Sequence, residues 1–222
     1  MEKKYEHIFF DLDRTLWNFD KNSKKVLNDI YNNFLLKEFI NSSDEFVNKY
    51  QEVNECLWAL YREDKVSKDE LRWKRFDDTL KYFGIRNVVA EEMGNYYVEH
   101  SPKQTLLFPN TIEVLEYLSK KYKLHIITNG FEEIQTKKMK KSGIYNFFDV
   151  IITSESVGVK KPNKKVFEYA LEKVNATASN CIMIGDNLEA DIEGALNCGI
   201  KAIHFNSEHL TKVPKNITSI NH

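Results

Sequence analysis

A short apolar run followed by two carboxylates, close to the N-terminus, constrains the fold of this chain more than any other feature. Residues 8–10 (Ile-Phe-Phe) are apolar without alternation, which is typical of a strand buried on both faces of a parallel sheet. Asp11 and Asp13 follow directly and project to the same side, because side chains alternate along an extended segment. In open α/β sheets ligands bind at the carboxyl ends of the strands, so we predict a binding edge here. The alternative is that Asp13 and Thr15 simply cap a turn.

The segment from residue 18 to residue 104 has helical periodicity throughout. Apolar residues recur at helical spacing, and residues 42–45 (Ser-Ser-Asp-Glu) and 67–70 (Ser-Lys-Asp-Glu) have the pattern of capping boxes at two helix starts. No alternating strand pattern occurs there. We therefore predict a helical insert of about four helices at 18–104, the last of them over about 88–100, within a second domain made of residues 1–17 and 105–222.

Strands and helices alternate regularly from residue 109 onward. Buried strands are predicted near residues 124–127, 149–154, 181–184 and 202–205, each separated from the next by a helical pattern. One of these helices is expected to follow Asp186 and to run to Cys198. This alternation indicates an α/β fold, a Rossmann-like parallel sheet with helices on both faces. Residues 211–222 are polar and are predicted to form a loosely held tail.

Composition excludes several other classes of protein. A net charge of -1 argues against a surface that binds a nucleic acid polymer or a membrane. The three cysteines, Cys56, Cys181 and Cys198, are widely spaced, which supports neither a disulfide framework nor a zinc site and favours reduced thiols in the cytoplasm. The N-terminal apolar run is too short for a signal peptide, and no segment is long enough to span a membrane. No feature predicts a particular oligomeric state.

Several polar residues follow the predicted strands, and their chemistry is coherent. They are Asp11, Asp13, Thr128, Asn129, Gly130, Lys161, Asp186 and Asp191. Neighbouring carboxylates repel one another unless a hard divalent cation such as Mg²⁺ lies between them. A Thr hydroxyl, the backbone N–H groups of residues 129 and 130 at a helix start, and a lysine suit phosphate oxygens. Each position also has an ordinary interpretation as a turn, a solvated lysine, a helix cap or a first-turn acid.

The order of these motifs resembles the haloacid dehalogenase-like (HAD) hydrolase superfamily over nearly the whole chain. Residues 11–15 (Asp-Leu-Asp-Arg-Thr), Thr128, Lys161-Pro162 and Gly185-Asp186 with Asp191 match its four motifs, and the helical insert resembles its C1 cap. Residues 127–131 (Ile-Thr-Asn-Gly-Phe) and 157–167 resemble the bacterial pyrimidine 5'-nucleotidase subgroup. Arg14 departs from the pattern, which usually has glycine there. Arg14 either stiffens the turn or points its own positively charged side chain toward the substrate.

The resemblance implies a role for each motif residue. Asp11 would attack phosphorus and form an aspartyl-phosphate, and Asp13 would protonate the leaving alkoxide and later activate water. Mg²⁺ would be held by Asp11, the backbone carbonyl of Asp13 and Asp186, with Asp191 binding directly or through another ligand. The phosphate-binding residues would be Thr128, Asn129, Gly130 and Lys161.

The implied substrate is a small phosphomonoester, most closely a pyrimidine nucleoside 5'-monophosphate. Four aromatic residues could stack on a base or could equally pack in the core: Trp17, Phe19, Trp58 and Tyr61. Phosphatases for sugar phosphates or phosphoglycolate would use the same motifs. A dehalogenase would not need Asp13 as a general acid, and a phosphoreceiver domain would need neither the length of this chain nor a helical insert.

Overall fold

The computed structural model describes residues 5–86, 89–207, 213–215 and 217–221, which form two compact units. One unit comprises the chain up to Phe19 together with the chain from Thr105 onward, and the other comprises Asp20–Gln104. The fully buried Trp17 ring belongs to the core of the first unit, and Phe19 packs against that core. None of the described helices is long and apolar enough to cross a membrane.

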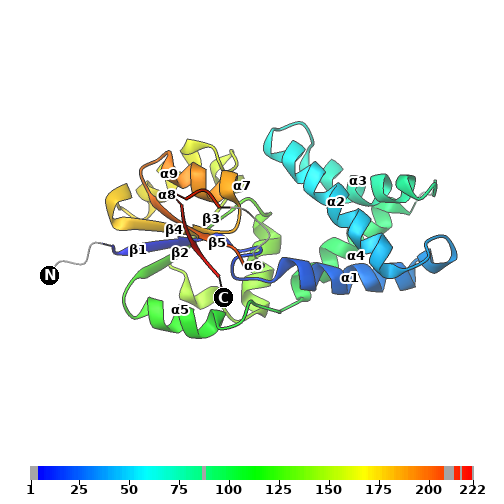
Figure 1. The fold of residues 1–222 in the computed structure, drawn as a ribbon, viewed down its shortest axis with the longest axis horizontal. Helices are drawn as coiled ribbons and strands as arrows, with labels where there is room; N and C mark the ends of the chain where they lie inside the picture. The colour runs from blue at the N-terminus through cyan, green and yellow to red at the C-terminus, as the bar shows by residue number, and fades with distance from the viewer. Residues whose placement is uncertain (1–4, 87–88, 208–212, 216, 222) are drawn as a thin grey trace. The chain divides into compact units, whose positions relative to one another are not determined.

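A parallel sheet of six strands forms the centre of the first unit (Figure 1). In spatial order the strands are β3 (Val150–Thr153), β2 (Lys123–Thr128), β1 (His7–Phe10), β4 (Cys181–Gly185), β5 (Lys201–Phe205) and β6 (Thr218–Ile220). In register, Phe10 lies beside Ile126 on one side and Ile184 on the other. The residues that follow β1, β2 and β4 are therefore brought to the same edge of the sheet.

Both faces of the sheet are covered, as the unbroken apolar run of β1 predicts. Phe9 packs with residues of α8 (Lys164–Lys173) and α9 (Gly194–Leu196), whereas Ile8 and Phe10 pack with residues of α5 (Thr111–Ser119) and α6 (Glu132–Lys141). This alternation confirms the predicted α/β class. The short helix α7 (Ser154–Val157) follows β3.

The second unit is helical. Its helices are α1 (Phe19–Asn33, whose first residue belongs to the other unit), α2 (Ser43–Arg62), α3 (Lys68–Tyr82) and α4 (Ala90–His100). Ser67 and Glu70 cap α3 reciprocally, and the Ser42 side chain accepts a hydrogen bond from the Glu45 N–H at the start of α2. The expected start of the last helix, at residue 88, lies outside the described residues. Single turns of 3₁₀ helix occur at Leu36–Glu38, Ser101–Lys103, Tyr145–Phe147 and Ala178–Asn180.

Two sequence-based expectations for the C-terminal third were wrong. The segment after Asp186 is not a continuous α-helix to Cys198: a π-helical segment, Leu188–Glu193, precedes the short α9. The expected loose tail contains β6, which pairs with β5, and the Asn206 N–H donates a hydrogen bond to the Ile220 carbonyl. Pairing of β6 depends on backbone groups, so its mostly polar side chains did not reveal it. Residues 211, 212, 216 and 222 of that tail lie outside the described part of the chain.

Two buried histidines stack near the amino ends of β1 and β2. The rings of His7 and His125 have centroids 5.3 Å apart, and His7 Nδ1 lies 3.0 Å from His125 Nε2. Burial, reinforced by the neighbouring His7, lowers the pKa of His125 to about 4, and burial also lowers the pKa of His7. The folded protein therefore keeps His125 neutral at mildly acidic pH.

This pair predicts a loss of stability in acid. Between about pH 6.5 and pH 4 the unfolded chain binds a proton at His125 and the folded chain does not, so the free energy of unfolding falls as the pH falls. We expect His125 to account for about 1–2 kcal/mol between pH 7 and pH 5, measured by urea unfolding. A His125→Leu variant should lose most of this difference. An unchanged pH dependence in that variant would contradict the prediction.

Candidate active site

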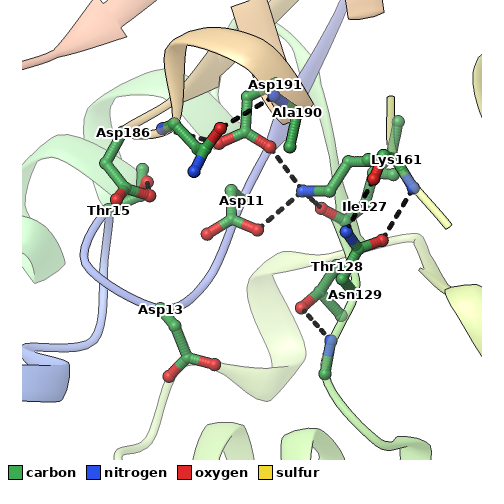
Figure 2. Close-up of polar contacts among 12 residues, drawn as sticks. Asp11, Asp13, Thr15, Ile127, Thr128, Asn129, Lys161, Asp186, Ala190 and Asp191 are labelled. Carbon is green, nitrogen blue, oxygen red and sulfur yellow. Dashed lines mark hydrogen bonds and ion pairs between the residues drawn. The ribbon is translucent and has the colours of Figure 1, made fainter. Parts of the chain in front are cut away.

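Three carboxylates converge at the carboxyl edge of the sheet (Figure 2). Asp11 follows β1, Asp186 follows β4, and Asp191 belongs to the π-helical segment after β4. One carboxylate oxygen from each lies within 4.8 Å of the others. Asp11 and Asp191 are buried. We call Asp11, Asp186 and Asp191 the carboxylate cluster. The adjacent parallel strands β1 and β4 thus bring Asp11 close to two carboxylates that lie at least 175 residues later in the sequence.

Lys161 lies against the carboxylate cluster, and only 2% of its surface is exposed. Its ammonium nitrogen is 2.7 Å from Asp11 Oδ1 and 2.6 Å from Asp191 Oδ1, and it donates a third hydrogen bond to the Ile127 carbonyl at 2.7 Å. The Asn129 side chain holds the backbone of Lys161 at both its N–H (2.8 Å) and its carbonyl (3.0 Å). Asn129 therefore fixes the position of Lys161, a contact that the sequence did not predict.

The electrostatics of the carboxylate cluster favour a bound cation. When all three carboxylates are ionised, the ammonium of Lys161 offsets one charge of three, which leaves two negative charges. Burial raises the pKa of Asp11 to about 7, against the lowering effect of Lys161, and burial with the neighbouring Asp11 raises the pKa of Asp186 well above its usual value. Burial disfavours the Lys161 ammonium, but Asp11 and Asp191 raise its pKa above the usual value. A set of carboxylate oxygens with two uncompensated charges fits a hard divalent cation such as Mg²⁺.

Close packing and hydrogen bonds orient the cluster. The Asn187 N–H donates to Asp191 Oδ2 at 3.0 Å, and the Asn187 side chain accepts from the Ala190 N–H at 2.8 Å. A side chain on Gly185 would bring its Cβ to 2.3 Å from Asp191 Oδ2, so only glycine fits there. The backbone carbonyl of Asp186 lies 2.8 Å from His204 Nε2, which ties this residue to β5.

The Asp13 side chain points away from the carboxylate cluster (Figure 2) and is held by α6. Its Oδ1 accepts a hydrogen bond from Lys138 Nζ at 2.6 Å, and its Oδ2 accepts one from Gln135 Nε2 at 2.9 Å. Between the two aspartates and the helical unit the chain turns through Arg14, whose φ of 63° lies in the left-handed region. The guanidinium of Arg14 lies 4.9 Å from the centre of the Phe19 ring.

Thr128 is the last residue of β2 and is buried beside Gln135, the residue that also donates to Asp13. Its hydroxyl oxygen accepts hydrogen bonds from the Gly130 N–H at 3.1 Å and from Gln135 Nε2 at 2.8 Å. The Gly130 N–H, which the sequence suggested as a phosphate donor, is therefore directed at Thr128 in this structure. Gly130 also packs tightly on Gln135, because a Cβ would lie 2.4 Å from its amide nitrogen.

The four candidate base-stacking aromatics fall into two groups. Trp17 is fully buried and Tyr61 is 7% exposed, which favours the packing interpretation for both. Phe19 and Trp58 are half-buried, and the Trp58 ring meets Tyr61 edge to face with centroids 5.4 Å apart. Phe19 and Trp58 thus keep part of their surface available.

Sequence reasoning missed the polar residues that support the motif side chains. Gln135 and Lys138 are buried, although both lie in a helix rich in lysine. Their spacing of three residues places them on one face of α6, the helix that follows Thr128 in the chain. This spacing was the available signal that both side chains could face the site. Asn187 gave no signal, because one asparagine after a strand is typical of any helix start.

The chain is similar to known proteins over most of its length. The family model described as "Haloacid dehalogenase-like hydrolase" matches residues 8–205. The Pyrimidine 5'-nucleotidase YjjG of Escherichia coli is 32% identical over 93% of this chain and 88% of its own, and the Pyrimidine 5'-nucleotidase PynA of Streptococcus pneumoniae is 30% identical over 93% and 86%. The crystal structure of the putative HAD-hydrolase YfnB from Bacillus subtilis, bound to magnesium, superposes with a TM-score of 0.88 at 27% identity and covers 98% of this chain and 95% of that chain.

Proposed function

This chain belongs to the haloacid dehalogenase-like hydrolases, and we propose that it hydrolyses phosphate monoesters, with pyrimidine nucleoside 5'-monophosphates as its substrates. The observation that carries the proposal is the contrast between two aspartates two residues apart. Asp11 lies in the carboxylate cluster against Lys161, while Asp13 is held separately by Lys138 and Gln135. This contrast supports Asp11 as the group that attacks phosphorus and Asp13 as the group that transfers a proton.

Asp11 is the proposed nucleophile. Lys161 binds its Oδ1, and its other oxygen points away from Lys161 (Figure 2). In the first step this oxygen forms a bond to phosphorus while the ester P–O bond breaks, and the leaving alkoxide takes a proton from Asp13, which must enter this step in its protonated form. In the second step water attacks the phosphorus of the aspartyl-phosphate, Asp13 takes the water proton, and Asp11 is released with inorganic phosphate.

Lys161 and Thr128 would bind the phosphoryl oxygens during transfer, and Asn129 keeps Lys161 in place for this. Asp11, Asp186 and Asp191, with the backbone carbonyl of Asp13, are the proposed ligands for Mg²⁺; the neighbour YfnB is magnesium-bound, which supports this choice. When bound, the cation supplies charge neutralisation for the carboxylates and the phosphoryl group. We further propose that residues 18–104 form the helical cap and that Phe19 and Trp58 are candidates for stacking on a base.

Phosphate release from a panel of esters tests the proposal. The panel contains UMP, dUMP, dTMP, sugar phosphates and phosphoglycolate, each assayed with Mg²⁺ and with EDTA. We expect release from the pyrimidine nucleotides with Mg²⁺ and none with EDTA. Preference for a sugar phosphate or for phosphoglycolate would retain the reaction and reject the substrate. No release from any ester would reject the function.

Stability gives a second, activity-independent readout of the cation. Mg²⁺ at about 100 times its dissociation constant should raise the free energy of unfolding by about 2.7 kcal/mol, because it binds only the folded protein. The midpoint of thermal unfolding with and without Mg²⁺ measures this. An Asp186→Asn variant serves as the control and should show a much smaller shift. Equal shifts in both proteins would mean that the cation binds elsewhere.

A further inference from the structure

Lys138 is a buried lysine that takes no part in the bond-making and proton-transfer steps of the proposed reaction. Only 4% of this residue is exposed, and its ammonium nitrogen lies 2.6 Å from Asp13 Oδ1. Burial of a lysine costs free energy unless a partner compensates its charge, and here the carboxylate of Asp13 is that partner. The contact joins α6 to the loop after β1, between residues 125 positions apart.

The ammonium of Lys138 is confined from its other sides by aromatic rings. It lies 4.2 Å from the centre of the Trp17 ring and 5.7 Å from that of Phe19, distances typical of cation–π contacts. Trp17 belongs to the same loop as Asp13: its carbonyl accepts a hydrogen bond from the Arg14 N–H at 2.9 Å, and its own N–H donates to the Leu12 carbonyl at 2.9 Å. The loop that carries Asp13 therefore also builds the pocket for the lysine that binds Asp13.

Gln135 completes the arrangement one helical turn away. Its amide nitrogen lies 2.9 Å from Asp13 Oδ2 and 2.8 Å from the Thr128 hydroxyl oxygen. Each oxygen of the Asp13 carboxylate thus has its own donor, which fixes both the position and the plane of the group. Gln135 also links this carboxylate to Thr128, a proposed phosphate-binding residue.

We propose that Lys138, assisted by Gln135, is a positioning residue that orients Asp13 for proton transfer and keeps it out of the carboxylate cluster. This inference rests on the proposed function. A free aspartate two residues from Asp11 would be drawn toward any cation held by the cluster, where it could no longer serve the leaving group. Catalytic groups lose much of their effect when misplaced by about 1 Å. Lys138 supplies the opposing attraction from the side of α6.

The leaving group of the substrate provides a selective test. Protonation matters most for a basic leaving group such as the 5'-alkoxide of UMP, and little for p-nitrophenolate, which leaves without a proton. We compare Lys138→Met, which keeps the apolar stem beside Trp17, with Lys137→Met, an exposed lysine of the same helix. For Lys138→Met we expect kcat to fall about 100-fold with UMP and less than about 5-fold with p-nitrophenyl phosphate, with KM little changed. Lys137→Met should match the wild type.

The outcomes separate the inference from the function. Equal losses of kcat with UMP and p-nitrophenyl phosphate, or no loss with either, would overturn the positioning role while leaving the phosphatase intact. A wild type that hydrolyses aryl phosphates but not UMP would reject the nucleotidase proposal; phenyl phosphate then replaces UMP as the ester with the more basic leaving group. An inactive wild type would reject both the positioning role and the proposed function.

If Lys138→Met does not fold, a Lys138→Gln variant replaces it. Glutamine is neutral but can donate a hydrogen bond to Asp13, so this variant should show the same difference between the two esters at smaller magnitude.

Discussion

An Asp11→Asn variant should lose at least about 10⁴-fold in kcat for phosphate release, because an amide oxygen is a poor nucleophile and cannot form the aspartyl-phosphate. The substitution keeps the shape of the side chain, so Lys161 and Asp191 retain their contact. Initial rates with Mg²⁺ and the best ester of the panel measure the loss. A variant that keeps more than about 1% of the wild-type kcat would exclude Asp11 as the nucleophile.

We expect the same variant to have an opposite effect on stability, which would show that the loss of activity does not come from unfolding. Burial raises the pKa of Asp11 to about 7 in the folded protein, so between about pH 4 and pH 7 the folded chain keeps a proton that the unfolded chain releases. The free energy of unfolding of the metal-free wild type therefore falls as the pH rises through this range, by up to about 4 kcal/mol from this group. Asp11→Asn, measured in EDTA, should be more stable than the wild type at pH 8 and should lose the part of this decline that Asp11 contributes, while Asp186 still contributes its own part.

Lys161→Met should impair both stability and activity. Methionine leaves the buried carboxylates of Asp11 and Asp191 without their shared cation, and the removal of one partner of a buried ion pair typically costs about 3–5 kcal/mol. Activity should fall by about 10³-fold or more, because the charge beside the transferring phosphoryl group is lost. Urea unfolding in EDTA and initial rates with Mg²⁺ are the measurements.

Two controls accompany this variant. Lys165→Met changes an exposed lysine a few residues away and should alter the free energy of unfolding by less than about 0.5 kcal/mol. The double variant Asp11→Asn/Lys161→Met should be more stable than Lys161→Met alone, because it removes one of the two stranded carboxylates. Strictly additive effects would mean that Lys161 does not stabilise Asp11 as the 2.7 Å contact implies.

The main architecture could be read from the sequence because it depends on local patterns. An apolar run without alternation at residues 8–10 is typical of a central parallel strand, and β1 is central. Regular alternation of strands and helices implies parallel pairing, and parallel pairing places every strand end at one edge. Asp11, Asp186 and Lys161 could therefore be expected near one another before any distance was known.

The partners of these residues depended on the tertiary structure. Nothing local to Lys161 distinguishes it from a solvated lysine; its contacts with Asp11 and Asp191 require β1, β2 and β4 to be assembled side by side. The same holds for Lys138, which reads as one more lysine of a surface helix until Asp13 and the Trp17 ring are brought to it. β6 was missed because backbone hydrogen bonds, which any sequence can make, hold it to β5.

What the sequence by itself determined was which groups reach the edge of the sheet, since strand periodicity and parallel topology follow from short-range steric and hydrophobic rules. Only the tertiary structure decided which carboxylate each lysine neutralises and that Trp17 packs inside rather than lying open to a substrate. The physical reason is that burial and pairing energies depend on distances of a few ångströms between groups far apart in the chain, and those distances exist only once the core has closed.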